Sequence, residues 1–340
     1  MDSETPVAPE DQEFLALLVH RGFLQREDAL AILQAAREQG FEAALEARTG
    51  WDASRVAYLR RTRGLSEPEI PGYEMLGRLG AGGTSEVFGA RRRKDFRKVA
   101  LKILLPRLAL DPPAVRRFLE EAKILQRLRH PNIVRGHRVF RFLGTYVLEM
   151  DLVPGRPLDQ VLEEDGPLDE ESALGVVRQV ARALEALREA GLVHRDLKPG
   201  NLMMDAQGKV VLIDLGFAGP GRDLEALEGT TLGTTAYIAP EQARGEEGLD
   251  VRADIYSLGA TLYHLVVGRL PFERSSDAEM MRAQILERLD GAALKEAPIS
   301  PSVHYFIQKM MAKDRELRYA SPAALAEEIE AHEEARRRLG

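Results

Sequence analysis

Residues 194–201 read His-Arg-Asp-Leu-Lys-Pro-Gly-Asn, and no other segment says as much about how the chain folds. Pro199 has no backbone N–H and bars an ordinary helix, so this segment is predicted to be a loop. Asp196, Lys198 and Asn201 place a carboxylate, an ammonium and a carboxamide in that loop. These groups can accept a proton from a hydroxyl, hold a phosphoryl oxygen and ligate Mg²⁺.

Four further motifs occur in order around this loop. Gly-Ala-Gly-Gly-Thr-Ser-Glu-Val at 80–87 and Val-Ala-Leu-Lys at 99–102 precede it, and Asp-Leu-Gly at 214–216 and Ala-Pro-Glu at 239–241 follow it. A lone glycine motif is weak evidence, but five ordered matches across about half the chain are not expected by chance. Together they resemble the signature of the eukaryotic-type serine/threonine protein kinases, and the glycine-rich stretch is most similar to bacterial members.

The resemblance covers about residues 73–335 and implies an α+β, bilobal protein kinase fold, with a small β-rich N-lobe and a large, mostly helical C-lobe. The strand–turn–strand pattern around 80–87 fits a kinase phosphate lid, whereas a dinucleotide-binding fold would follow its glycines with a helix. The predicted division is a disordered leader at 1–10, a small all-α segment at 11–64, a Pro- and Gly-containing linker at 65–72, an N-lobe at 73–152 and a C-lobe at 153–340.

Apolar side chains recur at helical spacing in residues 11–64. Asp52 is expected to cap a last helix that carries Val56 and Leu59. Part of this segment resembles small helical modules that begin some bacterial assembly ATPases; the alternative is a helical cap that packs on the kinase domain or on a partner. The side chains expected to face inward are Phe14, Leu17, Leu18, Ala29, Leu30, Ile32, Leu33, Ala43, Ala44 and Ala47.

The resemblance assigns roles to five polar residues. Asp196 would orient and deprotonate the substrate hydroxyl, and Lys198 beside it would hold a phosphoryl oxygen. Asn201 and Asp214 would hold Mg²⁺ with ATP, since a carboxylate at the end of an apolar strand needs a partner. Lys102 would clamp the α- and β-phosphates.

Helical spacing selects a partner for that lysine. Glu121 shares an inward face with Phe118 and Leu125, whereas Glu120 belongs to the polar face of the same helix. Glu121 is therefore expected to form the ion pair with Lys102 that marks an assembled active state in this family.

Further residues are assigned to ATP binding by the resemblance. Glycines in the lid let backbone amides approach phosphates closely, and Ser85 takes the place of the family's usual third glycine. Met150 would guard the back of the adenine pocket and the backbone at 151–153 would hydrogen-bond the base, while three apolar side chains, equally typical of a core, would sandwich it. The assigned residues are Gly80, Ala81, Gly82, Gly83, Thr84, Ser85 and Lys102 for the phosphates; Met150, Asp151 and Val153 for the hinge; and Val87, Ala100 and Met203 for the base.

The segment between Asp214 and Glu241 is rich in glycine and threonine and corresponds to the activation loop of the family. Thr230 or Thr231 is expected to be autophosphorylated and to contact Arg195 through a charge-assisted hydrogen bond. Thr234 is expected to belong to the substrate platform.

Two further residues are predicted to support the fold rather than the chemistry. Asp254, at the start of an apolar helix, is expected to anchor the backbone of the 194–201 loop. Glu241 is expected to pair with Arg318.

Composition limits the other possibilities. A net charge of −7 and a pI near 5.7 give no general drive toward nucleic acid or anionic membranes. The chain has no cysteine, which excludes a disulfide framework and suits a reducing cytoplasm. No apolar run approaches the ~20 residues that span a bilayer, and the N-terminus lacks a signal-peptide core.

The expected ligands are therefore ATP with Mg²⁺ and protein substrates. By the same resemblance, Lys198 favours serine/threonine over tyrosine specificity. Two alternatives remain: a catalytically silent scaffold, although such relatives normally lose Lys102, Asp196 or Asp214, and a small-molecule kinase, against which the substrate platform at 233–241 argues. Residues 11–64 are expected to dock on a partner or within the chain.

Overall fold

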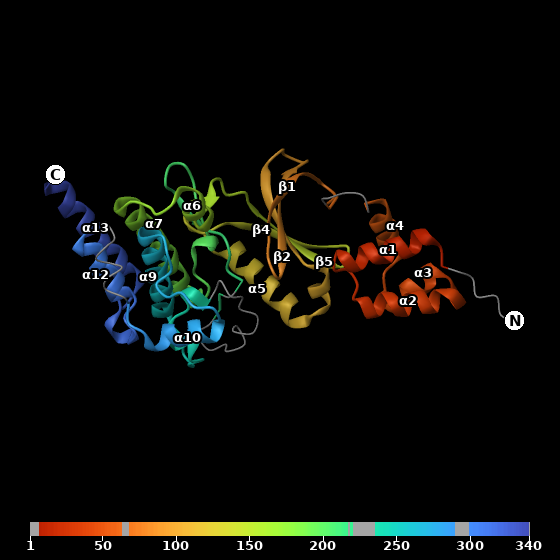
Figure 1. Cartoon of the computed structure of the whole chain (residues 1–340). Helices are drawn as coiled ribbons and strands as arrows, with labels where there is room; N and C mark the ends of the chain where they lie inside the picture. Colours follow the sequence, from red (N-terminus) through yellow and green to blue (C-terminus); the bar gives the residue numbers. More distant parts are fainter. Residues whose placement is uncertain (1–6, 63–67, 217, 220–234, 290–298, 340) are drawn as a thin grey trace. The chain divides into compact units, whose positions relative to one another are not determined.

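The computed structural model describes residues 7–62, 68–216, 218–219, 235–289 and 299–339 (Figure 1). Its contacts divide the chain into two compact units. The first consists of Met1–Ala122 with Gly136–Leu152, and the second of Lys123–Arg135 with Val153–Gly340. Thr230, Thr231 and Thr234 lie outside the described residues.

Four short helices open the first unit and share a hydrophobic core of their own. The first begins inside the predicted leader, at Pro9, because proline suits the first turn of a helix. Asp52 caps the last by accepting a hydrogen bond from the backbone N–H of Arg55 at 2.7 Å, as predicted. The helices are α1 (Pro9–His20), α2 (Arg26–Gln39), α3 (Phe41–Thr49) and α4 (Ala53–Arg61).

The inward face of these helices is partly different from the predicted one. Leu30 is 59% exposed, because the buried side chains of α2 are those of Ala29, Ile32 and Ala36, and a neighbouring position points about 100° away. In α3 the buried side chains are those of Ala44 and Leu45. Ala43 and Ala47, which were predicted to face inward, are exposed. In α1, Leu15 is buried with Phe14 and Leu18, and Leu17 is only half-buried.

A five-stranded antiparallel sheet follows, in the order β1-β2-β3-β5-β4. The glycine-rich stretch joins β1 to β2, which confirms the predicted strand–turn–strand pattern. The elements are β1 (Tyr73–Ala81), β2 (Ser85–Arg92), β3 (Lys98–Leu104), the 3₁₀ turn η1 (Pro106–Leu110), α5 (Pro112–Arg127), β4 (Gly136–Phe142) and β5 (Thr145–Asp151).

The second unit is mostly helical, with a small sheet in the order β6-β7-β8. Helix α7 packs against α9 and α13 in its core. Asp254 lies in the first turn of α9, which begins three residues earlier than predicted because Asp250 caps it. The elements are β6 (Arg156–Pro157), α6 (Leu158–Asp165), α7 (Glu170–Glu189), η2 (Pro199–Asn201), β7 (Leu202–Met204), β8 (Val210–Leu212), η4 (Thr235–Tyr237), α8 (Pro240–Ala243), α9 (Val251–Val267), α10 (Asp277–Leu286), α12 (Pro301–Met310), η5 (Arg315–Leu317) and α13 (Pro322–Leu339).

Within the described ranges, no helix has the length and apolar character needed to cross a bilayer.

Candidate active site

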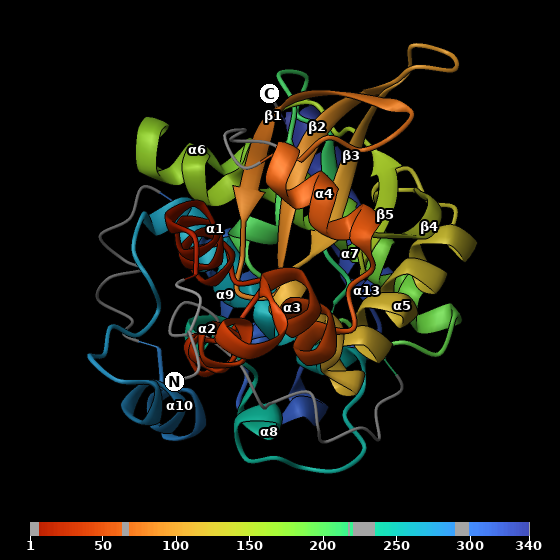
Figure 2. The same cartoon turned by 90° about the vertical axis from the view of Figure 1, so that its right-hand side faces the viewer.

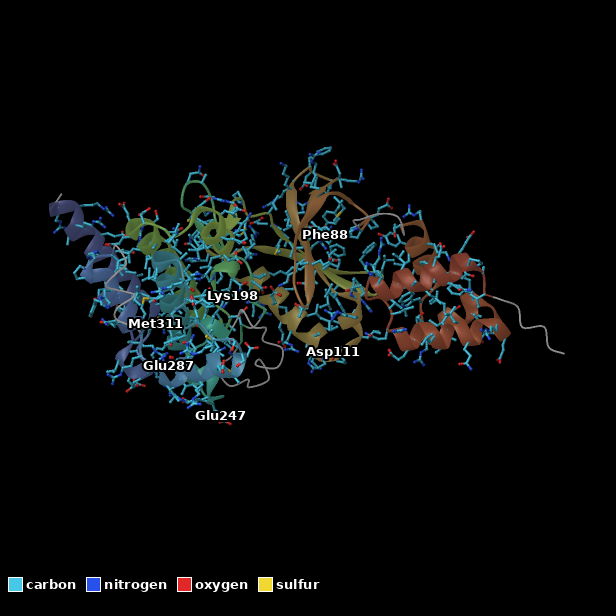
Figure 3. The ribbon with its side chains drawn as sticks, in the orientation of Figure 1. Phe88, Asp111, Lys198, Glu247, Glu287 and Met311 are labelled. Carbon is cyan, nitrogen blue, oxygen red and sulfur yellow. The ribbon has the colours of Figure 1, made fainter. Side chains whose placement is uncertain are left out.

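The loop at 194–201 gathers three of the predicted polar side chains in the second unit. Lys198, labelled in Figure 3, places its ammonium 3.2 and 3.1 Å from the two carboxylate oxygens of Asp196. Asn201 donates from its amide nitrogen to the same carboxylate at 3.0 Å and to the Asp196 carbonyl at 2.7 Å. The carboxylate is therefore held in place between a cation and an amide, while Asp196 remains 9% exposed.

Asp254 anchors this loop, as predicted. Its fully buried carboxylate accepts the backbone N–H groups of His194 and Arg195, both at 2.8 Å. Burial raises the pKa of Asp254. Arg195 has φ +70°, a left-handed conformation that a side chain other than glycine adopts only where its surroundings enforce it. The two hydrogen bonds to Asp254 supply part of that enforcement.

The strands β7 and β8 bring Asp214 beside Asn201. The backbone N–H of Ile213 donates to the Asn201 carbonyl at 3.0 Å, so the next residue, Asp214, follows at that end of the small sheet. The Asp214 carboxylate accepts the N–H of Gly216 at 2.8 Å, and His194 lies 2.8 Å from the Asp214 carbonyl oxygen.

This donor set fits Mg²⁺. Carboxylate and amide oxygens are the ligands that the ion prefers, and it usually takes only one or two protein groups together with substrate phosphates and water. The described residues contain no group of three or more His, Cys, Asp and Glu side chains that could hold a metal by themselves. Asn201 directs its amide nitrogen at Asp196, which turns its Oδ1 away from that residue.

The first unit contains the predicted ion pair. The ammonium of Lys102, on β3, lies 2.7 and 2.8 Å from the two oxygens of Glu121, on α5. Both residues are buried, whereas Glu120 is exposed, as its place on the helix predicts. Helix α5 starts after Asp111 (Figure 3), which accepts the backbone N–H of Ala114 at 3.1 Å.

The residues assigned to ATP are divided between the units. In the first unit, the glycine-rich stretch turns with the Gly82 N–H bonded to the Ser85 carbonyl at 2.8 Å. Ala100 and Met150 are buried and lie opposite each other on β3 and β5. Val153 and Met203 belong to the second unit.

Asp151 has partners that the sequence did not suggest. Its carboxylate lies 2.7 Å from both Arg97 and His137. Arg97 comes from the basic β2–β3 turn, so this turn is tied to the end of β5.

The predicted bridge between Glu241 and Arg318 forms in the second unit. The guanidinium makes two parallel contacts, at 2.5 and 2.8 Å, with the carboxylate. Gln242, next to the glutamate, donates to the Arg195 carbonyl at 2.8 Å, which connects this region to the 194–201 loop.

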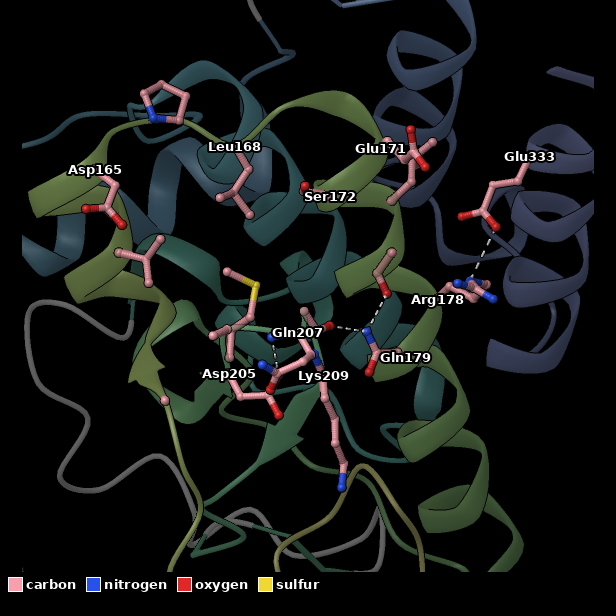
Figure 4. Close-up of a pocket in the computed structure, with 18 of the residues that line it drawn as sticks. Asp165, Leu168, Glu171, Ser172, Arg178, Gln179, Asp205, Gln207, Lys209 and Glu333 are labelled. Carbon is pink, nitrogen blue, oxygen red and sulfur yellow. Dashed lines mark hydrogen bonds and ion pairs between the residues drawn. The ribbon is translucent and has the colours of Figure 1, made fainter. Parts of the chain in front are cut away.

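The second unit also contains a cavity of about 1030 Å³ that sequence reasoning missed. Figure 4 shows it between α6, α7, the β7–β8 turn and the end of α13. Its polar groups pair with one another: Arg178 lies 3.6 Å from Glu333, and Gln179 donates to the Gly208 carbonyl at 2.8 Å. Among the described lining residues are none of those assigned to catalysis or to ATP.

Comparison with known proteins supports the resemblance to the protein kinase family. The protein kinase domain model matches residues 73–333. The chain is 36% identical over 282 residues to the serine/threonine-protein kinase pkn3 of Myxococcus xanthus, covering 78% of this chain and 51% of that protein. It is 35% identical to PksC of Streptomyces coelicolor (75% and 48% covered) and 34% identical to PknB of Mycobacterium leprae (76% and 42% covered), both serine/threonine-protein kinases.

The chain thus spans about half the length of the curated relatives that it matches. Its match to the domain model covers most of the sequence and includes every motif around the 194–201 loop. The chain therefore belongs to the protein kinase domain family.

Proposed function

We propose that the protein is an active serine/threonine protein kinase, which transfers the γ-phosphate of ATP to protein hydroxyl groups. The observation that carries the proposal is the set of contacts around Asp196, in which Lys198 and Asn201 hold the carboxylate in place. A scaffold that had lost catalysis would have no need to preserve these contacts together with the buried Lys102–Glu121 pair. The names of the relatives agree with the proposal.

In this proposal the second unit supplies the chemistry. Asp196 accepts the proton of the attacking hydroxyl, and Lys198 neutralises charge on the transferring phosphoryl group. Asn201 and Asp214 would hold Mg²⁺, which when bound neutralises and orients the triphosphate.

The first unit binds the nucleotide. Lys102, oriented by Glu121, contacts the α- and β-phosphates, while the backbone amides of residues 80–85 cover them. Ala100 and Val87 contact the adenine and the backbone at 151–152 hydrogen-bonds it, while the second unit contributes Val153 and Met203 to the same base.

The proposal extends to regulation and location. Thr230 or Thr231 is autophosphorylated and its phosphate binds Arg195, while Thr234 contributes to the substrate platform. The reaction takes place in a reducing compartment, the cytoplasm, which suits a chain without cysteine.

A phosphotransfer assay tests the proposal. Purified protein is incubated with labelled Mg-ATP and a generic basic protein, and label on either protein is measured. The wild type should transfer label to serine or threonine, and Asp196→Asn should lower the rate by about 10³-fold, since it removes the proton acceptor. Asp165→Asn, an exposed aspartate in the same unit that pairs with Arg156, is the matched control and should leave the rate unchanged. No label in the wild type would favour the scaffold.

A further inference from the structure

The helices α1–α4 contact the kinase sheet of the first unit at two places. The turn after α1 lies close to η1: a Cβ built on Gly22 would be 3.9 Å from Cδ of Arg107. Helix α4 meets the turn between β4 and β5, where the rings of Tyr58 and Phe142 pack edge to face with centroids 5.4 Å apart. Figures 1 and 2 show the four helices beside this end of the sheet.

The second contact is tight. Arg55 of α4 stacks over the Trp51 ring at 4.1 Å, and its guanidinium fills the space over Gly144, where a Cβ would lie only 2.1 Å from Nη1. Burial lowers the pKa of this guanidinium to about 10. Gly144 has φ +82°, so the turn itself favours glycine.

From the first contact, one residue reaches the glycine-rich lid, defined as residues 80–87. Arg107 donates from Nη2 to the carbonyl of Gly83, at the tip of the lid, with an N–O distance of 2.6 Å. The side chain of this arginine therefore lies near Gly22, and its guanidinium binds the lid.

From the second contact, a chain of hydrogen bonds reaches the same tip. Thr145, buried at the start of β5, donates from its hydroxyl to the Leu104 carbonyl at 2.6 Å. The next residue, Leu105, donates its backbone N–H to the carbonyl of Thr84 in the lid at 2.9 Å. Both contacts of the helices with the sheet therefore lead, within a few residues, to carbonyls of the lid tip.

We propose that α1–α4 brace the glycine-rich lid, and that Arg107 is the positioning residue through which they act. The inference rests on the proposed function, in which the lid covers the phosphates of ATP. A glycine-rich segment loses much conformational freedom when it orders around a ligand, and holding it in place beforehand reduces that cost of binding. The brace should therefore affect the KM for Mg-ATP more than kcat.

Four variants separate the brace from general destabilisation. Arg107→Ala removes the hydrogen bond to the lid, and Arg107→Lys retains the charge and the apolar stem. Gly144→Ala forces Arg55 away from the β4–β5 turn. Gly166→Ala is the matched control, because Gly166 has nearly the same φ, +84°, but a Cβ there meets nothing within 4 Å.

The first measurement is hydrogen–deuterium exchange of the protein without nucleotide, followed on peptides that cover residues 80–88. Arg107→Ala and Gly144→Ala should raise the exchange rate there about fivefold, the effect of losing one hydrogen bond in a partly exposed site. Arg107→Lys should stay within about twofold of wild type, and Gly166→Ala should not differ from it.

The second measurement is the KM for Mg-ATP, which should rise by about the same factor in the first two variants with kcat within about twofold of wild type. Unchanged exchange at 80–88 in Arg107→Ala, or an equal rise in Gly166→Ala, would overturn the brace. If the wild type transfers no phosphate, the proposed function fails, and the exchange measurement still decides on the brace.

Discussion

Both units of this protein contain a buried ion pair between a glutamate and a basic side chain that was predicted from the sequence, and the two pairs are built differently. In the first unit, the Lys102 ammonium lies against both oxygens of Glu121, with side chains 8% and 3% exposed. In the second, Arg318 binds Glu241 with two parallel contacts, and the side chains are 0% and 4% exposed.

The guanidinium of the second pair makes several further contacts. Arg318 also donates to the carbonyls of Ala312 and Arg252, both at 2.8 Å, and lies over the Tyr256 ring at 4.9 Å. A guanidinium used in this way has a fixed orientation and joins separate segments of backbone. A lysine is a point charge on a flexible stem, which can exchange one anion for another. From this difference in chemistry we expect Arg318 to serve the stability of its unit and Lys102 to serve ligand binding.

The largest effect should come from Lys102→Met. Loss of the ammonium should lower phosphotransfer by about 10³-fold, or about 4 kcal/mol of transition-state stabilisation, because the phosphates lose a positioned positive charge. The stability of the protein should change much less, since the Glu121 carboxyl can take up a proton. Phosphotransfer and urea denaturation are measured on the same preparation.

The control is Lys98→Met, a lysine at the exposed start of the same strand. It should leave both quantities unchanged. Phosphotransfer above a tenth of the wild-type rate in Lys102→Met would contradict the assignment of this lysine.

Arg318→Met should have the opposite effect: it should lower the stability of the protein and leave phosphotransfer largely intact. It leaves the Glu241 carboxylate and several backbone carbonyls buried without their donor, which should lower the free energy of unfolding by about 3 kcal/mol. Phosphotransfer per folded molecule should stay within severalfold of wild type. The measurement is the urea midpoint at unchanged slope.

Arg315→Met, a partly exposed neighbour in η5, should shift that midpoint little. A stable Arg318→Met protein without activity would show that this pair serves the chemistry rather than the fold.

Much of this site could be predicted because its residues are close in sequence or lie on one helix. Asp196, Lys198 and Asn201 share a loop, and helical spacing alone separates Glu121 from Glu120. Asp254 stands at the start of an apolar helix and was expected to anchor this loop, and its hydrogen bonds to the loop confirm that prediction.

Other features depend on which face of a helix is buried and on how distant segments pack together, and no local sequence pattern encodes these. Leu30 was predicted to face inward, and this was wrong. An error of one residue in assigning the buried face of a helix rotates that face by about 100°. The contacts of α4 with the β4–β5 turn join segments more than eighty residues apart, between Tyr58 and Phe142.

A third buried glutamate, which sequence reasoning missed, sharpens the comparison. Glu149 on β5 is 0% exposed and binds Arg92 at 2.8 Å and Arg138 at 3.0 Å. The Tyr73 hydroxyl donates to the same carboxylate and accepts from Arg138 at 2.6 Å. Strand pairing brings these groups together, since Tyr73 lies opposite Arg92 and Arg138 opposite Glu149.

The smallest effect should come from Tyr73→Phe in this cluster. It keeps the stacking on Phe140, whose ring is 6.1 Å away, and loses the hydroxyl, which should lower the free energy of unfolding by about 1 kcal/mol at pH 7. Burial and the Glu149 carboxylate raise the pKa of Tyr73 from 10 to about 12. Below pH 10 the phenol is protonated in the folded and unfolded chain alike, and its contribution is complete.

Between pH 10 and 12 the unfolded chain releases this proton while the folded protein retains it, so the contribution of Tyr73 is lost as pH rises through about 12. The free energy of unfolding of wild type minus that of Tyr73→Phe should therefore fall from pH 9 to pH 11.5, measured by urea denaturation at each pH. The subtraction cancels the titration of the other tyrosines, which both proteins share. A difference that stays constant over this range would mean that Glu149 is held by its two arginines alone, as Glu241 is held by Arg318.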